Sequence, residues 1–391
     1  MNTAKQIIIS MIRSVIENKQ CDISSDDADW KLVYMICQRA QITPLIYEAI
    51  EKSQYDVPEQ IRNVFQQSAM YQVVLDQQQQ YFIALLIEEF NKAGIDFVLL
   101  KGASLKQIYP STLFRTMSDI DILIKDEQYP LIQEKMLSLS FEEKLESDHE
   151  YIWFYPPNIH IELHKKLIPS YNKDFFEYYG SGWRLMNNYK QHQYKLSPEN
   201  ELIYLLSHFA KHYRDGGIGI RHIIDIWVFR KHYPDLDEKY ILQELKTLHL
   251  DKFYLNVLDT VDVWFNGQKH TLATEMITKT IFGSGSYGTA ERAERSNALR
   301  LSKKHKSAFW AKICYLLSLV FPPKSMMYNK YPILEKRPYL LPVFWVRRWG
   351  EALIFKKNEI KRQSKRAKNI SQETVDLYQE ELNAVGLDYF F

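Results

Sequence analysis

The chain has 391 residues, of which 46% are apolar and 25% are charged, and its formal net charge at pH 7 is +2. These values are ordinary for globular proteins, so they exclude a disordered, collagen-like or low-complexity chain, and the length predicts two or three domains. Only 13 residues are glycine, and because sheet-rich folds need many turns with positive φ, this scarcity predicts a mostly helical protein.

The N-terminal region, residues 1–92, is predicted to be helical throughout. Apolar residues recur there at the spacing of an amphipathic helix. The glycine that follows the last of these helices is typical of a helix stop, because glycine adopts the left-handed conformation without strain. The predicted helices cover residues 7–15, 27–39 and 45–52, and a long stretch that Val57-Pro58 opens and Gly94 ends.

The hydrophobic pattern changes in residues 93–190, where short apolar runs bounded by turn residues predict strands between short helices. Pro156-Pro157-Asn158 is a turn signal between two of these strands. The region is therefore predicted to be a small α/β core with a mixed sheet. The predicted strands are 95–100, 117–125, 151–155 and 159–164, and the predicted helices are 105–109 and 127–138.

Residues 191–391 are predicted to be helical again. Ser197 is a predicted N-cap ahead of Pro198, and a further helix over 221–231 follows a break at 215–217. The whole chain is thus predicted to have a helix-dominated α+β fold, in which helical regions flank the small mixed-sheet core.

The end of the chain is strongly basic. Residues 291–370 contain 20 Lys and Arg against 5 Asp and Glu, with Trp310, Trp345 and Trp349 among them. Two interpretations stay open. One is an anionic partner, such as nucleic acid, acidic lipid or a phosphorylated substrate. The other is a solvated charged surface on helices.

No export signal or transmembrane segment is predicted. The apolar run near the N-terminus is interrupted by Arg13, and the apolar stretch 313–323 is shorter than the roughly 20 residues that a bilayer span takes. The three cysteines, Cys21, Cys37 and Cys314, form no CxxC pair, which disfavours a disulfide framework and a cysteine-based zinc site. We therefore expect a cytoplasmic protein.

Two acidic residues, Asp119 and Asp121, lie two positions apart in the predicted strand 117–125. Side chains of a strand alternate between its faces, so both carboxylates share one face, while Ile120 and Ile122 face the core. Neighbouring carboxylates repel unless a cation lies between them, and hard oxygen ligands suit Mg²⁺. Alone, such a pair is also typical of an exposed acidic strand.

Two further elements favour the cation site. Gly102 and Ser104 lie where a predicted strand turns into a helix, and there the free N–H groups of the helix start can bind phosphate oxygens. Glu162 adds a third carboxylate from the polar face of the predicted strand 159–164. Three acids on two strands beside such a turn favour two-metal phosphoryl or nucleotidyl transfer.

The same residues resemble a known family. The segment FVLLKGASLKQIYPSTLFRTMSDIDILIK at 97–125, followed by IHIELH at 159–164, is similar to the uncharacterised nucleotidyltransferase family of bacteria. That family belongs to the superfamily of DNA polymerase beta, aminoglycoside nucleotidyltransferases and minimal antitoxin-type nucleotidyltransferases. The resemblance covers residues 90–225 and implies a nucleotidyltransferase core over 93–190.

This resemblance implies a role for each residue of the motif. Gly102 and Ser104 match the phosphate-binding turn of the superfamily. Asp119 and Asp121 match its metal-binding pair, and Glu162 matches its third acid. These three acids are the expected catalytic and metal-binding residues.

The implied reaction moves a nucleoside monophosphate from a triphosphate, expected to be ATP, to a hydroxyl group of a small molecule or a protein. Mg²⁺ or Mn²⁺ is the expected cofactor, and pyrophosphate is released. Glu162 is either a ligand of a second ion or the general base. Lys101 and Arg115 are candidates for neutralising phosphate charge, the alternative for Arg115 being a surface cation.

Other polar residues of the region are predicted to have roles that do not involve a metal. His160 and His164 form an H-x-E-x-H pattern on a strand, which differs from the helical H-E-x-x-H zinc motif, so we expect them to line the cleft. His208, Arg221 and Asp225 either face the cleft or form helix caps and salt bridges.

The competing function is non-enzymatic. A chain of this fold that has lost turnover would act as a nucleotide-sensing, protein-binding or membrane-interacting module. Pyrophosphate release from labelled nucleotides separates the two functions.

Overall fold

A computed structural model describes residues 3–20, 28–53, 55–285, 288–305, 308–322, 333–355 and 371–388, together with Lys324, Met327, Lys330 and Tyr331. The chain forms two compact units. The first comprises Met1–Tyr213, Gly217–Gly288 and Val385–Leu387, and the second Arg214–Gly216, Thr289–Ala384 and Asp388–Phe391. Cys21 and residues 356–370 of the predicted basic end lie outside the described residues.

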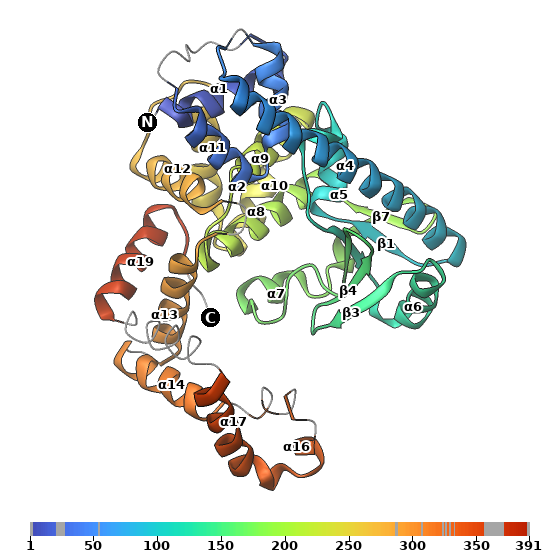
Figure 1. Cartoon of the computed structure of the whole chain (residues 1–391), viewed down its shortest axis with the longest axis vertical. Coiled ribbons are helices and arrows are strands. Elements are labelled where there is room, and N and C mark those ends of the chain that lie inside the picture. Colours follow the sequence, from blue (N-terminus) through green and yellow to red (C-terminus); the bar gives the residue numbers. More distant parts are fainter. Residues whose placement is uncertain are drawn as a thin grey trace. The chain divides into compact units, whose positions relative to one another are not determined.

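Helices open the first unit (Figure 1). Ile8, Met11 and Ile12 lie on one side of the first helix and are fully buried, as their spacing predicts. The predicted helix stop at Gly94 is confirmed, because this glycine has a left-handed φ of 72°. These helices are α1 (Thr3–Glu17), α2 (Trp30–Ala40), α3 (Thr43–Lys52) and α4 (Glu59–Ala93).

The first unit contains a seven-stranded mixed sheet. Its order is β3 (Glu142–Glu146), β4 (Glu150–Tyr155), β5 (Ile159–His164), β2 (Ile120–Ile124), β1 (Phe97–Leu99), β7 (Gln193–Leu196) and β6 (Met186–Lys190). β2 is parallel to β5 and antiparallel to β1, and β1 is parallel to β7. The predicted helix-dominated α+β fold with a mixed sheet is thus confirmed.

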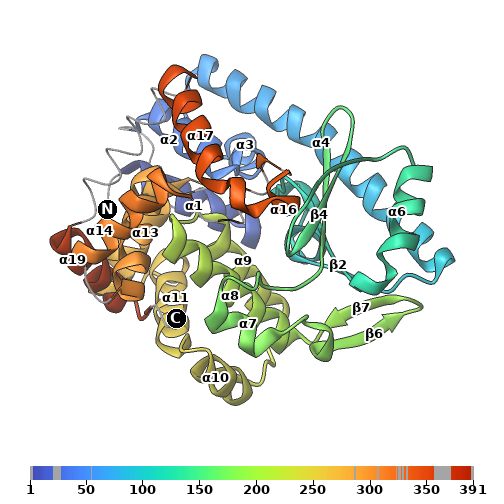
Figure 2. The same ribbon diagram turned by 90° about the horizontal axis from the view of Figure 1, so that it is seen from below.

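One face of the sheet packs against helices in an apolar cluster. Ile120, Ile122 and Ile124 of β2 are fully buried, as the alternation of the strand predicts. They belong to one apolar cluster with residues of α4 and of α6 (Tyr129–Ser138). Figure 2 shows α4 and α6 beside the strands. The other face of β2 carries Asp121 and the fully buried Leu123.

Several elements differ from the expectation. The sequence pattern does not predict β3, β6 and β7, because β3 is exposed at every position and β6 is largely exposed, so neither shows an apolar alternation. The predicted strands 95–100 and 117–125 are shorter than expected. The helix expected over 105–109 begins earlier, as α5 (Lys101–Leu105), and continues as a 3₁₀ turn over Lys106–Ile108.

The remaining helices of the first unit come after β5 in sequence. Ser197 caps the helix that begins at Pro198, because its hydroxyl accepts a hydrogen bond from the backbone N–H of Asn200 (3.2 Å), as predicted. These helices are α7 (Lys173–Tyr179), α8 (Pro198–Asp215), α9 (Arg221–His232), α10 (Glu238–Thr247), α11 (Asp251–Phe265) and α12 (Leu272–Ser284).

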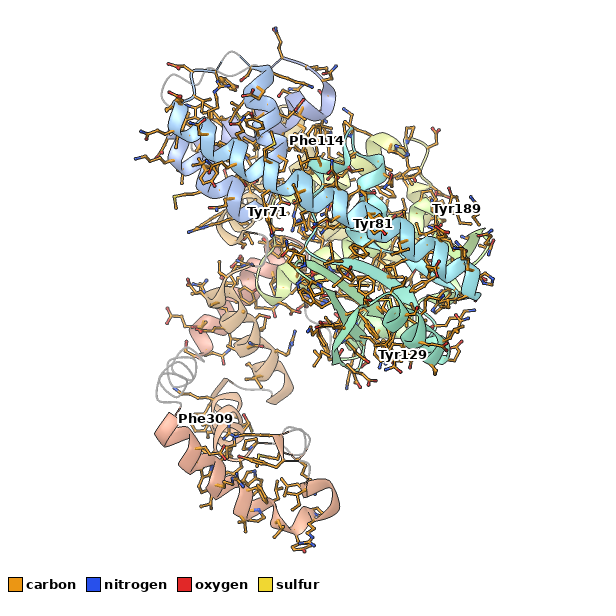
Figure 3. The ribbon with its side chains drawn as sticks, turned by 45° about the vertical axis from the view of Figure 1, so that its right-hand side comes forward. Tyr71, Tyr81, Phe114, Tyr129, Tyr189 and Phe309 are labelled. Carbon is orange, nitrogen blue, oxygen red and sulfur yellow. The ribbon has the colours of Figure 1, made fainter. Side chains whose placement is uncertain are left out.

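The second unit is helical where it is described. Its helices are α13 (Ala290–His305), α14 (Ala308–Val320), α16 (Ile333–Lys336), α17 (Leu341–Phe355) and α19 (Gln372–Ala384). Phe309 is exposed at the start of α14 (Figure 3). In the described part of the chain, no helix is long and apolar enough to cross a bilayer. The anionic partner of this region stays a prediction.

Candidate active site

Two neighbouring strands bring Asp121 and Glu162 together. β2 and β5 run parallel, and Asp121 is the partner of Glu162 in their register. Both side chains therefore leave the same face of the sheet, opposite to the buried isoleucines. Asp121 is buried and Glu162 is half-buried.

Lys101 forms an ion pair with Asp121. The backbone N–H of Leu100 donates to the carbonyl oxygen of Asp121 (3.0 Å), which places the start of α5 beside β2. Lys101 has a φ of 48°, a left-handed conformation that costs such a residue about 1–2 kcal/mol. Its Nζ lies 2.6 Å from Asp121 Oδ1. Burial by itself raises the pKa of Asp121, but Lys101 and His164 outweigh burial and hold it well below its usual range.

His164 completes a compact group of possible metal ligands with these two acids. Its Nε2 lies 2.8 Å from Asp121 Oδ1 and 3.5 Å from Glu162 Oε2. One ligand atom of each of Asp121, Glu162 and His164 lies within 4.8 Å of the other two. Burial and Lys101 lower the pKa of His164, but the hydrogen bonds to the two carboxylates outweigh them and raise it.

Two further carboxylates lie close to this group. Burial, together with the charges of Glu162 and Asp121, raises the pKa of Asp119 to about 6. Glu150 is the register partner of His164 on β4, and its Oε2 lies 3.6 Å from His164 Nδ1. Burial and the charge of Glu162 also raise the pKa of Glu150. Burial is the larger cause of both shifts, and the neighbouring carboxylate charges add to it.

Asp119, Asp121 and Glu162 line one cavity of about 310 Å³. Lys101 and Gly102, two of the predicted nucleotide ligands, line it as well. The structure therefore brings the three predicted acids and the start of α5 to one place.

Ser104 lies elsewhere. Its hydroxyl donates to Glu201 Oε1 of α8 (2.7 Å), and it lines a separate cavity of about 670 Å³. The reason is helical geometry, since α5 already includes Gly102 and residues two positions apart on a helix point about 200° apart. We expected Gly102 and Ser104 to line one phosphate site because we expected the helix to begin only after Ser104.

Arg115 was also predicted to bind phosphate. It lines the acidic cavity, and its guanidinium forms a buried ion pair with Asp225. Its Nε and Nη2 donate to the two carboxylate oxygens of Asp225 at 2.6 and 2.9 Å. The hydroxyl of Tyr109 donates to the same carboxylate at 2.6 Å. Both Arg115 and Asp225 are buried, so Arg115 is no surface cation, and Asp225 forms the salt bridge that was one of its two expected roles.

Three histidines line the same cavity from α8 and α9. They are His208, for which facing the cleft was one of two expected roles, and His212 and His222, which the sequence pattern did not single out. Burial lowers the pKa of His208 and His222 well below the usual range, and it lowers that of His212 to about 2. The spacing of His208 and His212, four residues apart on a helix, is the signal that reveals the pair.

Gly102 allows α5 to approach the segment before β2. A Cβ at this position would lie 2.9 Å from the Cβ of Met117, which is closer than real Cβ contacts. We expect Gly102→Ala to lower the free energy of unfolding by about 1–3 kcal/mol, measured by urea denaturation. Gly283→Ala in α12 is the control, because a Cβ there meets nothing within 4 Å and alanine favours the helix. Equal stability of the two variants would contradict the close approach.

The donor set fits a hard divalent cation. Carboxylate oxygens are the preferred ligands of Mg²⁺ and Mn²⁺. Asp119, Asp121 and Glu162 supply such oxygens in one cavity, and the charges of Glu162 and Asp121 add to burial in raising the pKa of Asp119. The ammonium of Lys101 neutralises part of the charge of Asp121. A bound metal ion would neutralise more of it.

Comparison with known proteins yields one match. A family model described as "Uncharacterised nucleotidyltransferase" matches residues 26–266. The matched stretch contains every residue that lines the acidic cavity. No curated protein and no solved structure matches the chain.

Proposed function

Because the chain belongs to the uncharacterised nucleotidyltransferase family, we propose that it transfers a nucleoside monophosphate from a nucleoside triphosphate to a hydroxyl acceptor. The observation that carries this proposal is the group of Asp121, Glu162 and His164, whose ligand atoms lie within 4.8 Å of one another. Clustered acids in a cavity are the arrangement that phosphoryl-transfer sites use. ATP is the proposed donor, and a small molecule or a protein side chain is the proposed acceptor.

Mg²⁺ or Mn²⁺ is the proposed cofactor, held by Asp119, Asp121 and Glu162. When bound, such an ion neutralises phosphate charge and lowers the pKa of the acceptor hydroxyl. His164 orients Asp121 through its hydrogen bond to Oδ1. When the triphosphate binds, the ammonium of Lys101 contacts a phosphate oxygen as well as Asp121. Gly102 has no side chain, which leaves room for the phosphates beside the backbone.

In the proposed reaction, the acceptor oxygen forms a bond to the α-phosphorus. The bond between that phosphorus and the oxygen bridging to the β-phosphorus breaks, and pyrophosphate leaves with the bonding electron pair. The proton of the acceptor hydroxyl passes to a carboxylate. Glu162 is the candidate for this role, because its half-buried side chain is more accessible than that of Asp121.

The test incubates the full chain with nucleoside triphosphates labelled on the α-phosphate, with Mg²⁺ and with either a panel of small hydroxyl compounds or a cell lysate. We expect pyrophosphate release together with a labelled product, and neither of them when EDTA replaces Mg²⁺. Nucleotide binding without pyrophosphate release would instead support the non-enzymatic module. Absence of binding for every nucleotide would overturn both functions.

The raised pKa of Asp119 predicts that Mg²⁺ binding depends on pH. A carboxyl group must lose its proton to bind a metal, and with a pKa of about 6 Asp119 is ionised above pH 6 and protonated below it. We expect the apparent Mg²⁺ affinity to fall about tenfold between about pH 7.5 and pH 5, measured by calorimetric titration. Asp119→Asn should lose this part of the pH dependence, and a flat profile for the unaltered chain would contradict the prediction.

A further inference from the structure

Helix α14 of the second unit exposes a stripe of large apolar side chains. Phe309 lies seven residues before Leu316, and Leu316 lies four residues before Val320, so the three share one face of the helix. They are 67%, 41% and 43% exposed, and Leu317 beside them is 52% exposed. Large apolar side chains that form a continuous exposed patch mark an interaction site.

Helix α17 of the same unit exposes a second apolar stripe. Val343 and Val346 are three residues apart and therefore lie on one face of the helix, where they are 62% and 60% exposed. Other side chains join this helix to α14 (Figure 1). The indole N–H of Trp349, for example, donates to the backbone carbonyl oxygen of Val320 at 2.6 Å. The two stripes therefore differ from the side chains that hold the two helices together.

Positive charge accompanies both stripes. Residues 308–355 contain seven Lys and Arg against two Glu. Lys312 is half-buried at the edge of the stripe on α14, and the exposed Arg347 follows directly after the stripe on α17. Glu351 pairs with Arg347 at 3.1 Å, and exposed pairs of this kind are weak.

This combination fits the surface of an anionic lipid membrane. Apolar side chains on one helix face enter the boundary between headgroups and acyl chains, while Lys and Arg at the edge of that face contact acidic headgroups. Trp310, which is 57% exposed beside the stripe on α14, has the amphipathic ring that is enriched at this depth. A second copy of the chain fits less well, because two basic surfaces repel each other. Nucleic acid offers phosphate charge but would leave the aliphatic side chains in water.

We propose that α14 and α17 bind in the plane of a membrane surface that contains anionic lipids. The two helices have 13 and 15 residues, fewer than the roughly 20 that a bilayer span takes, so they lie along the surface. The residues that line the acidic cavity all belong to the first unit. The proposed membrane surface is therefore a separate site from the one that would perform nucleotidyl transfer.

Co-sedimentation of the full chain with lipid vesicles tests this surface. We expect binding to vesicles of phosphatidylcholine and phosphatidylglycerol, weakened by added NaCl because salt screens the charges. Phe309→Ser/Leu317→Ser should lower the partition coefficient at least about tenfold, since each variant position loses an apolar side chain that the membrane would bury. The matched control is Leu137→Ser/Leu255→Ser, which changes two exposed leucines of the first unit and should leave the partition coefficient unchanged.

A charge variant completes the experiment. Lys312→Gln/Arg347→Gln should weaken binding to the anionic vesicles at least about fivefold. Circular dichroism establishes that each variant is folded. Equal binding to vesicles of phosphatidylcholine alone would overturn the role of the basic residues, and absence of binding to both vesicle types would overturn the proposal. A dimer abolished by the serine variant would then assign the stripes to a second copy of the chain, and oligonucleotide binding would assign the basic residues to nucleic acid. Asp121→Asn should bind vesicles like the unaltered chain, so this result is independent of the proposed nucleotidyl transfer.

Discussion

Asp121→Asn is expected to reduce Mg²⁺-dependent nucleotidyl transfer by about 10²–10³-fold, measured as kcat/KM from pyrophosphate release. Asp121 interacts with more of the other site residues than a single ion pair would require. It binds Lys101 at 2.6 Å and His164 at 2.8 Å, and it is the register partner of Glu162. Asparagine has nearly the same shape but no charge, so it removes the strongest ligand for a cation while leaving the strand intact.

Asp259→Asn is the matched control for this experiment. Asp259 is exposed on α11 and does not line the cavity, so the same chemical change there should leave the rate unaltered. Because Asp121→Asn also deprives Lys101 of its partner, urea denaturation of each variant is needed to show that the protein assayed is folded. Full activity in a folded Asp121→Asn protein would refute the assignment of this carboxylate to the metal.

Asp225→Ala is expected to lower the free energy of unfolding by about 3–5 kcal/mol. Asp225 accepts two hydrogen bonds from Arg115 and one from Tyr109, at 2.6 to 2.9 Å, and both charged side chains are almost fully buried. Removing the carboxylate leaves a buried guanidinium without its counter-charge, which is far more costly than losing an exposed pair. Urea denaturation of the full chain measures the change.

Two comparisons make this stability prediction specific. Glu48→Ala breaks an exposed pair with Lys52 in α3, and it should cost no more than about 0.5 kcal/mol. The double variant Arg115→Ala/Asp225→Ala should lose less than the sum of the two single variants, because it leaves no unpaired charge. Additive losses would show that the two side chains stabilise the fold independently.

The sequence predicted the strand 159–164 with the observed bounds. It also predicted correctly which side chains of the strand 117–125 face the core. Apolar and polar residues alternate throughout 159–164, and in 117–125 the alternation covers Asp119 to Ile122. Alternation by itself assigns a face to each side chain. The same rule placed Asp119, Asp121 and Glu162 on polar faces, and the cavity contains all three. The strands β3 and β6 could not be found in this way, because they are exposed and carry no apolar alternation.

Only the folded chain assigns partners to these side chains. Ser104 and Arg115 looked equally suited to phosphate, yet Ser104 binds Glu201, 97 residues away, and Arg115 binds Asp225, 110 residues away. Lys101 likewise binds Asp121, and its backbone has a left-handed φ, which no propensity of lysine predicts.

The sequence by itself therefore determined the helix-dominated α+β class and the faces of the central strands, and it predicted three acids that the structure brings to one cavity. The tertiary structure alone decided which cations pair with those acids. It placed His164 at 2.8 Å from Asp121, and it added His212 and His222 to the cavity. The physical reason is the separation along the sequence of the residues that interact. Helix and strand periodicity arises between residues a few positions apart, whereas hydrogen bonds and ion pairs join whichever elements the packing of the core brings together.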